Sequence, residues 1–324
     1  MINIIQPNNE IPCLAIAVPC FNEEGLISKT SIVLNKVLDD LVSRNLVLKH
    51  SFIFFIDDGS SDHSWEKIKS LNHSSGRIKG ARLSKNFGHQ AALFAGYSCL
   101  VDQSDVVISI DADLQQDPNS IPLFIEKYAE GFDVVLGIRR DRNADGIFKK
   151  LTAQFFYKLA SFMGVEIIPN HADYRLLSKR ALSSLLLFQE PGIFLRALCL
   201  QLGFPTAVVQ FDVCERLEGN SKYTFKKMVR LSLDGITSFS VVPLRLVFAI
   251  GLIVFLLSLI MSAYVLWTFM VNDHVIPGWA STILPIYLIG GIQLLCLGVI
   301  GEYLGNIFKV VRNRPRWIFE SILK

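Results

Sequence analysis

Closely spaced cysteines are absent from this sequence, so the cysteines give no sign of a metal or redox site. The 324 residues contain six cysteines, and no two of them are three positions apart. Zinc sites and small disulfide-stabilised domains depend on such close spacings. We therefore expect reduced cysteines that pack among other side chains, without a zinc site or a disulfide framework.

Signals for export and for nucleic-acid binding are also missing. The first 12 residues are polar and include a proline, unlike the charged and then apolar stretch of a signal peptide, so we expect the folded domain to stay on the cytoplasmic side. The net charge is +3, and no basic patch coincides with a nucleic-acid-binding motif. Nucleic acid is therefore not an expected partner.

Charged side chains are absent from two long segments in the last third of the sequence. Residues 247–271 and 275–301 contain no Asp, Glu, Lys or Arg, and each is longer than the roughly 20 apolar residues that cross a hydrocarbon core. Basic residues flank the pair on both sides, whereas the loop between the two segments has none. The positive-inside rule then predicts a two-helix transmembrane hairpin over 246–304, with both flanks in the cytoplasm. The alternative is a helix buried in a protein core.

The remainder of the chain divides into one large domain and two short segments. Residues 1–222 alternate short apolar runs with amphipathic stretches, which predicts an α/β domain with a mostly parallel, Rossmann-like sheet covered by helices. The expected strands are 14–19, 52–56, 78–83, 106–110 and 133–137, and the expected helices are 23–41, 88–100 and 118–128. Residues 223–245 predict amphipathic juxtamembrane helices, with packing on the soluble domain as the alternative, and residues 305–324 predict a basic cytoplasmic tail.

Two carboxylates follow a wholly apolar strand. Asp111 and Asp113 come directly after residues 106–110, at the carboxyl end of a strand, where open α/β sheets bind their ligands. Carboxylate oxygens suit Mg²⁺ or Mn²⁺, and such an ion usually keeps several waters and is shared with substrate phosphates. The pattern therefore predicts a metal–diphosphate site, with an acidic turn as the alternative.

Polar groups also follow other predicted strands. The segments 19–24 and 57–62 each end a strand, where a helix N-terminus or a carboxylate can bind a nucleotide, although both segments can also be helix caps. Arg139, after the fifth strand, suits a diphosphate or a solvated turn. Arg216 and Lys222 stand on either side of a glycine, just before the segment that faces the membrane, and suit a phosphate at the lipid surface.

Several motifs taken together resemble a known enzyme family. They are AVPCFNEE (17–24), FIDDGSSD (55–62), LSKNFGHQAALFAG (83–96), IDADLQQDP (110–118), ADYRLLSKRA (172–181), GITSFSVVPLR (235–245), GGIQLLCLGVIGEYLG (290–305) and the RPRW tail. The set resembles the family-2 glycosyltransferases of the GT-A fold, in particular the polyprenyl-phosphate glycosyltransferases. Examples are the bactoprenol glucosyltransferases and, more distantly, dolichol-phosphate mannose synthase. The resemblance covers almost the whole chain.

The resemblance implies a UDP-sugar donor and a divalent cation, Mg²⁺ or Mn²⁺. The residues implied to contact the donor are Pro19, Phe21, Glu23, Asp58, Ala112, Gln115 and Arg139. The residues implied to hold the metal and the diphosphate are Asp111, Asp113 and Gln115.

It also implies a lipid acceptor, undecaprenyl phosphate, whose phosphate Arg216 and Lys222 would bind. The catalytic residues implied are Asp113 and Asp173. Membrane lipid is a further expected partner. Short hairpins of this kind often pack against copies of themselves, which leaves a homo-oligomer open.

Two further features of the sequence bear on substrate and chemistry. His89 and Gln90 stand where the bactoprenol group often has Lys-Glu, which leaves the sugar open among glucose, N-acetylglucosamine and galactose. His89 and His171 have no partner at metal-ligand spacing, so we interpret both as structural, with a metal ligand or an acid–base group as the alternative. The Gln-x-x-Arg-Trp signature of processive polysaccharide synthases is absent, so a single-sugar transfer is expected.

The implied reaction is an inverting transfer from a UDP-sugar, with UDP-glucose expected, to undecaprenyl phosphate for modification of a cell-envelope glycan. A phosphate monoester has its second pKa near 6. The attacking oxygen is therefore ionised at neutral pH, and Asp173 is expected to be a positioner or a weak base. The rivals are a nucleotidyltransferase that releases pyrophosphate and a non-catalytic membrane scaffold with a degenerate transferase domain. Loss of Asp111 or Asp113 would mark the scaffold, and both are present.

Overall fold

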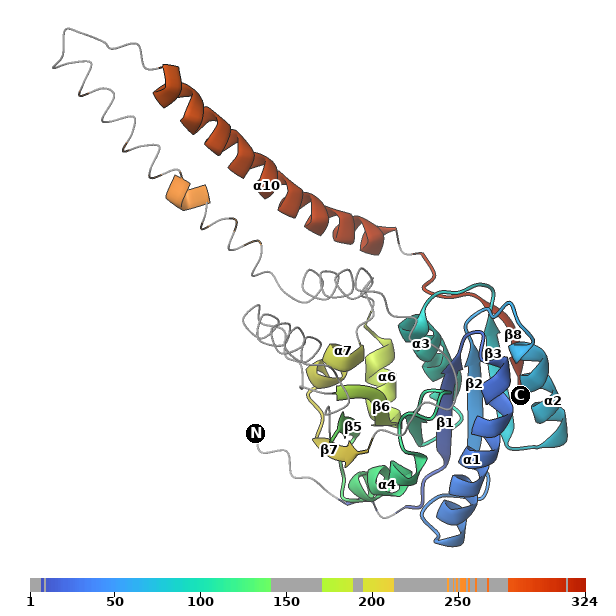
Figure 1. Cartoon of the computed structure of the whole chain (residues 1–324). Coiled ribbons are helices and arrows are strands. Elements are labelled where there is room, and N and C mark those ends of the chain that lie inside the picture. The colour runs from blue at the N-terminus through green and yellow to red at the C-terminus, as the bar shows by residue number, and fades with distance from the viewer. Residues whose placement is uncertain are drawn as a thin grey trace.

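The computed structural model describes residues 7–8, 10–140, 171–188, 195–212, 279–312 and 314–324, together with single positions and one short stretch between 244 and 267. These residues form an eight-stranded sheet with helices on both faces (Figure 1). The strands, in the order in which they lie, are β7 (Thr206–Phe211), β5 (Val134–Arg139), β6 (His171–Ser178), β4 (Val106–Ser109), β1 (Leu14–Cys20), β2 (Phe52–Asp57), β3 (Ile78–Leu83) and β8 (Phe319–Leu323).

The centre of the sheet is parallel, as predicted. β1 pairs in parallel with β2 and β4, and β2 pairs in parallel with β3. The carboxyl ends of these four strands therefore meet at one edge of the sheet, which we call the carboxyl edge. All five predicted strands are present close to their expected bounds, and the α/β fold is confirmed.

The sheet as a whole is mixed, which corrects the prediction of a mostly parallel one. β6 runs antiparallel to both β4 and β5, and β8 runs antiparallel to β3. Neither β6 nor β8 was predicted from the sequence. Because β6 is reversed, its amino end lies at the carboxyl edge, and this direction brings a new set of polar residues there.

Helices cover both faces of the sheet because β1 is apolar on both of its faces. Leu14, Ile16 and Val18 join one core, with α1, α2 and α4, while Ala15 and Ala17 join the other, with α3, α6 and α7. The helices are α1 (Glu24–Ser43), α2 (Ser64–Ser74), α3 (His89–Leu100), η1 (Pro118–Ser120) with α4 (Ile121–Ala129), α6 (Lys179–Leu186), α7 (Leu195–Gln201) and α10 (Trp279–Val311). The three predicted helices are confirmed, whereas α2, α6 and α7 were missed.

The close packing of α3 fixes the position of its first turn. Small side chains on its face of β1 let the helix approach the sheet. A Cβ atom at Gly96 would lie 2.6 Å from Cγ1 of Ile56, so this helix and β2 are in direct contact. α3 follows β3 and therefore begins at the carboxyl edge, where it presents His89 and Gln90.

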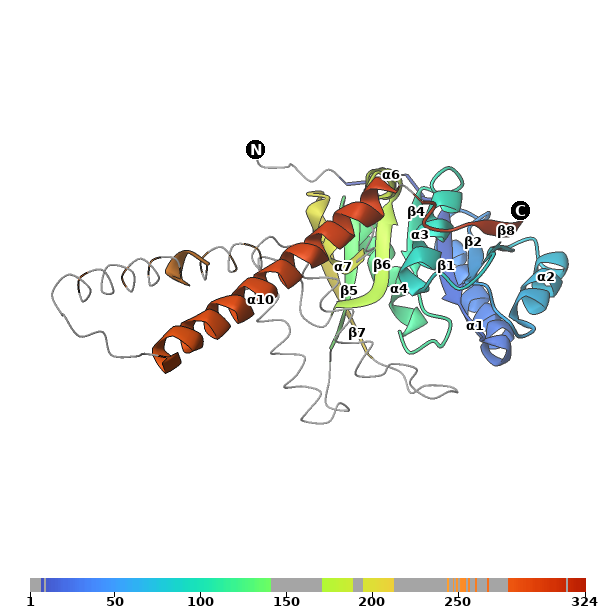
Figure 2. The same ribbon diagram turned by 90° about the horizontal axis from the view of Figure 1, so that it is seen from above.

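The long helix α10 begins far from the α/β domain and runs toward it, and the chain then joins the sheet as β8 (Figures 1 and 2). The segment predicted as a basic tail contains the end of α10 and the edge strand β8, so the C-terminal residues belong to the sheet. In the described part of the chain, no helix has the length and apolarity needed to cross a membrane.

Other expectations for this region fall largely outside the described residues. These include the first predicted span, 247–271, and most of the juxtamembrane segment, 223–245. The division of the chain at residues 222, 245 and 304 stays a prediction. The five cysteines in the described residues are free, as expected, and Cys214 lies outside them.

The contact between Gly96 and Ile56 can be tested by a double-mutant cycle. We expect Gly96→Ala to lower the free energy of unfolding by about 1–3 kcal/mol, because the added methyl group overlaps the Ile56 side chain. In an Ile56→Ala background the same change should be neutral or stabilising, since the space is open and alanine favours a helix. Urea unfolding of the four proteins measures the coupling, and strictly additive effects would contradict this packing.

Candidate active site

The carboxyl edge brings together two aspartates that are far apart in the sequence. Asp111 follows β4, and Asp173 lies near the amino end of the reversed strand β6. The register pairs Ser109 with Arg175, so Asp173 lies just beyond the end of β4. The Ser109 hydroxyl donates to the backbone carbonyl of Asp173 at 3.0 Å, which fixes the two strand ends against each other.

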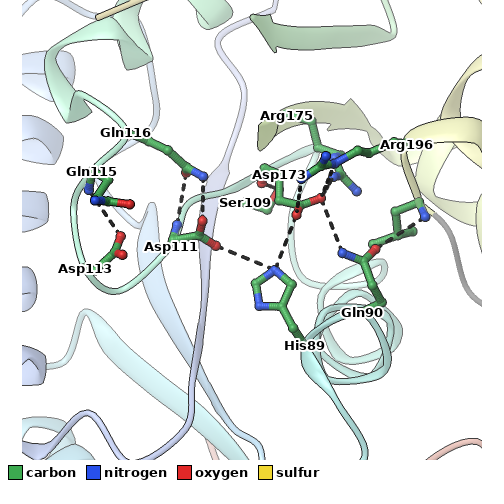
Figure 3. Close-up of polar contacts among 11 residues, drawn as sticks. His89, Gln90, Ser109, Asp111, Asp113, Gln115, Gln116, Asp173, Arg175 and Arg196 are labelled. Atoms are coloured by element: carbon green, nitrogen blue, oxygen red, sulfur yellow. Dashed lines mark hydrogen bonds and ion pairs between the residues drawn. The ribbon is translucent and has the colours of Figure 1, made fainter. Parts of the chain in front are cut away.

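His89 lies between the two carboxylates (Figure 3). Its Nε2 atom is 3.6 Å from Oδ1 of Asp111 and 3.9 Å from Oδ2 of Asp173. The sequence spacing indicated no partner for His89, whereas the structure places it beside both carboxylates; its role stays a prediction. Its place at the start of a helix that follows a parallel strand was the signal that could have identified it, because such helix starts face the carboxyl edge.

His171 is unlike His89 in its surroundings. Its side chain is buried, and neither ring nitrogen has a hydrogen-bond partner among the described residues. Burial, together with the nearby guanidinium groups of Arg175 and Arg196, lowers the pKa of His171 to about 3. A neutral, buried imidazole agrees with the structural interpretation of this residue.

Asp111 is held rigidly in a crowded negative environment. Its backbone N–H donates to Oε1 of Gln116 at 3.0 Å, and its Oδ2 accepts from Nε2 of the same side chain at 2.7 Å. Burial, and then the negative charges of Asp173 and Asp113, raise the pKa of Asp111 to about 6 despite the opposing effect of His89. About a third of its side chain remains exposed. Asp111 is thus a carboxylate whose burial and negative neighbours outweigh the positive charge of His89 and Arg196.

Asp173 has the opposite electrostatic environment. Its Oδ1 forms an ion pair with the fully buried Arg175 and accepts from Nε2 of Gln90 at 3.3 Å, while its Oδ2 accepts from Nη2 of Arg196 at 3.0 Å. Burial alone would raise the pKa of Asp173, but the two guanidinium groups and His89 outweigh burial and hold it well below its usual range. At neutral pH this carboxylate is therefore ionised, holds its partner side chains in place and is a weak base.

The loop after β4 carries the second predicted metal ligand. Asp113 accepts from the backbone N–H of Gln115 at 3.2 Å, and Leu114 between them has a positive φ of 52°. The carbonyl of the buried Ala112 accepts from the Thr30 hydroxyl at 2.7 Å, which attaches the loop to α1. Asp113 and Gln115 therefore lie beside Asp111 on a loop of defined conformation (Figure 3). No three His, Cys, Asp or Glu side chains gather as a metal site within the described residues.

The loops that follow β1 and β2 are hydrogen-bonded to each other at the same edge. The backbone N–H of Glu23 donates to Oγ of Ser64 at 3.0 Å. The Asp62 carboxylate accepts from the N–H groups of Glu24 and Ser64, the first residues of α1 and α2. These contacts hold the predicted nucleotide residues Pro19, Phe21 and Glu23, at the end of β1 and the start of α1, next to the loop that carries Asp58.

Asp58 has a structural task that the sequence did not indicate. Its buried carboxylate accepts from the backbone N–H groups of Phe87 at 2.7 Å and Gly88 at 2.9 Å. Gly59 has a φ of 67°, and a Cβ atom there would lie 2.4 Å from the Lys85 carbonyl carbon. Asp58 and Gly59 together thus fix the loop that precedes α3 and its first residue, His89. The predicted contact of Asp58 with a nucleotide stays a prediction.

The other predicted site residues are placed less centrally. Arg139 ends β5 at the carboxyl edge, where the neighbouring Ile138 pairs with His171. Arg216 and Lys222 lie outside the described residues. The site residues missed from the sequence are His89, Gln90, Gln116, Arg175 and Arg196. Arg175 and Arg196 act through Asp173, and a strand or helix pattern does not reveal such a contact.

Residues 15–186 match the profile of Glycosyl transferase family 2, and residues 242–307 match that of the GtrB C-terminal hairpin. The uncharacterized glycosyltransferase YkoT of Bacillus subtilis (strain 168) is 43% identical over 311 residues, which cover 95% of this chain and 91% of YkoT. The SfII prophage-derived bactoprenol glucosyl transferase of Shigella flexneri is 37% identical over 309 residues, 95% of this chain and 97% of that protein.

Among solved structures, the mannosyltransferase PcManGT from Pyrobaculum calidifontis aligns over 93% of this chain and 90% of its own. The identity is 12% and the TM-score is 0.45.

The raised pKa of Asp111 predicts that this carboxylate destabilises the metal-free protein. Its folded-state value of about 6 lies above the value of about 4 expected in the unfolded chain. The folded state therefore loses stability as the pH rises from about 4 to about 6, and the full loss is present at about pH 7.5. We expect Asp111→Asn to raise the free energy of unfolding there by on the order of 1 kcal/mol, a value reduced for the partial exposure of the group.

Urea unfolding in the presence of EDTA measures this effect at about pH 7.5 and about pH 4, where the gain should disappear. Asp102→Asn, at an exposed surface carboxyl, is the matched control and should change stability by less than about 0.5 kcal/mol. An Asp111→Asn gain that is equal at both pH values would contradict the electrostatic explanation.

Proposed function

We propose that this chain, which belongs to glycosyl transferase family 2 and is a glycosyltransferase, moves a single sugar from a UDP-sugar to undecaprenyl phosphate with inversion. The observation that carries the proposal is the joining of Asp111 and Asp173 through His89 at the carboxyl edge. The lipid acceptor is supported by the bactoprenol glucosyl transferase names of relatives about as long as this chain. Glucose is the proposed sugar, with N-acetylglucosamine and galactose as alternatives.

The donor would lie along the carboxyl edge. In this proposal Pro19, Phe21, Glu23 and Asp58 contact the uridine half, and Arg139 approaches the phosphates or the sugar. Asp111, Asp113 and Gln115 offer hard oxygen ligands, and the raised pKa of Asp111 indicates a carboxylate that a cation would stabilise. These residues therefore fit Mg²⁺ or Mn²⁺, with the remaining ligand positions left to phosphate oxygens and water. A divalent ion held there would offset the negative charge on the departing UDP.

The acceptor needs little help from a base. A phosphate oxygen of the lipid forms the new bond to the anomeric carbon, while the bond from that carbon to the β-phosphate oxygen of UDP breaks. The lipid phosphate is already ionised at neutral pH, since its second pKa is near 6. Asp173, with its low pKa, then acts by holding Arg196 and orienting His89. Arg216 and Lys222 would offset the charge of the incoming phosphate.

The proposed location is the cytoplasmic face of the inner membrane, with residues 246–304 inserted as a multi-pass hairpin. Large apolar side chains of α10 are exposed along its length, among them Ile286, Leu297, Leu304 and Phe308. A soluble monomer rarely exposes such a continuous apolar surface, which usually marks contact with a membrane or another protein. The uncharged segments and their basic flanks favour the membrane. The polyprenyl chain of the acceptor would lie in the same bilayer.

The direct test incubates the purified protein with undecaprenyl phosphate, Mn²⁺ or Mg²⁺, and UDP-glucose, UDP-N-acetylglucosamine or UDP-galactose. We expect UDP release matched by a lipid that gains the mass of one sugar, and loss of both in EDTA. Asp113→Ala should abolish transfer without a change in thermal midpoint. UDP release without a lipid product, or near-normal turnover in that variant, would contradict the proposal. Release of pyrophosphate from a nucleoside triphosphate would favour a nucleotidyltransferase.

The role of Lys222 predicts an effect on one substrate only. Lys222→Ala should raise the apparent KM for undecaprenyl phosphate by about tenfold, because a hydrogen bond to a charged group is lost. The KM for the UDP-sugar should stay near the wild-type value, and Lys222→Arg should restore much of the affinity for the lipid. Initial rates with each substrate varied in turn measure both constants. Equal increases in KM for the two substrates would contradict the proposed place of Lys222 in the acceptor site.

A further inference from the structure

The C-terminal residues form β8, the outermost strand on one side of the sheet. This strand begins at the carboxyl edge, where the active site lies. β8 runs antiparallel to β3, and Phe319 at its start pairs with Leu83 at the end of β3. The N–H of Ser84, the residue after β3, donates to the carbonyl of Ile318 at 2.9 Å. The chain that comes from α10 therefore reaches the α/β domain at the carboxyl edge, on the same side as Asp111 and Asp173 (Figures 1 and 2).

The residues just before β8 contact the helix that carries His89. Nη2 of Arg316 donates to the carbonyl of Phe188 at 2.6 Å, and its guanidinium carbon lies 5.3 Å from the ring centre of Phe94 in α3. The ring of Trp317 packs on the same Phe94 at 5.9 Å between centroids. Cation–π and aromatic contacts of this kind add to ordinary burial. We call residues 316–323 the C-terminal clamp.

Phe94 lies about one helical turn after His89 and Gln90, which contact the two catalytic-site carboxylates. The clamp therefore holds α3 one turn away from the active site. Because α3 is in direct contact with β2 at Gly96, the helix cannot shift freely when it is held at Phe94. A change in the contacts of the clamp with Phe94 is therefore expected to alter the positions of His89 and Gln90 at the carboxyl edge.

Arg82 joins β8 to the second loop of the site. Its Nε atom lies 3.3 Å from the Glu320 carboxylate in β8 and 3.4 Å from the buried carboxylate of Asp57 at the end of β2. Its Nη2 donates to the carbonyl of Ser60 at 3.0 Å. The clamp therefore contacts both α3 and, through Arg82, the loop that contains Asp58. Backbone pairing of an edge strand does not require these side-chain contacts.

From this arrangement we infer that the C-terminal clamp is a positioning element that sets α10 against the carboxyl edge. Only residues 312–315 separate the end of α10 from the clamp, so the placement of the clamp determines where the hairpin joins the catalytic domain. This inference rests on the proposed function, in which the acceptor phosphate is held at a bilayer. The clamp would then bring that phosphate to the bound donor. Arg316 and Trp317 are then positioning residues for the acceptor, and they contact neither substrate.

The test compares two acceptors of the same chemistry. Undecaprenyl phosphate in liposomes is held in a bilayer, whereas geranyl phosphate in solution can diffuse to the donor freely. We expect Arg316→Ala and Trp317→Ala to lower the ratio of the liposome rate to the solution rate by about tenfold or more, as misplacement of a reacting group does. The KM for the UDP-sugar should stay unchanged, and Arg316→Lys and Trp317→Phe should restore most of the ratio.

Arg314→Ala is the matched control, because this exposed residue carries the same charge two positions away and makes no hydrogen bond or ion pair with the described residues. It should leave the ratio unchanged. An equal fall for Arg314→Ala would show that basic charge near lipid is what matters, and would overturn the clamp. Parallel losses with both acceptors, or no loss in either alanine variant, would overturn it as well.

Failure of the underlying function gives a different result. If the wild-type protein transfers sugar to neither acceptor, both the proposed function and the positioning role of the clamp are wrong. If the wild type uses both acceptors and the variants keep the ratio, only the clamp is wrong. Thermal melting with and without UDP checks that each variant is folded and still binds the donor nucleotide.

Discussion

The buried ion pair between Arg175 and Asp173 is the interaction on which the site depends. Arg175 has no exposed surface, and removal of one partner from such a buried pair costs about 3–5 kcal/mol. Asp173 must therefore stay ionised and in place. From that fixed position it holds Arg196 and Gln90 and lies close to His89, which in turn approaches Asp111. Strands β4 and β6 and helices α3 and α7 are thus joined around one carboxylate.

The remaining charge at the carboxyl edge is unbalanced, and this imbalance supports the proposed binding of a cation and a diphosphate there. Asp173 is neutralised by guanidinium groups, whereas Asp111 has a raised pKa because burial and neighbouring carboxylates act against its ionisation. Protein sites that carry such uncompensated charge are commonly functional, because the charge is retained at a cost in stability. A cation bound between Asp111 and a diphosphate would remove the imbalance in the protein and in the substrate together.

Local sequence patterns were sufficient to predict the parallel centre of the fold and the positions of Asp111 and Asp113. Buried strands such as 106–110 are apolar throughout, and ligands bind where such strands end. The reversed strand β6 was not predictable in this way, because an apolar pattern does not state the direction of a strand. Arg175 was missed since arginine is rarely fully buried, and His89 since its partners come from distant strands. β8 was not predicted because the basic residues of its segment are typical of a tail.

We propose that the carboxyl edge binds a nucleoside diphosphate together with a divalent cation. Isothermal titration of UDP into the purified protein, once with Mn²⁺ and once with EDTA, measures this binding. We expect UDP to bind at least about tenfold more tightly with Mn²⁺, which corresponds to about 1.4 kcal/mol. Equal affinity under the two conditions, or no binding of UDP under either, would contradict it.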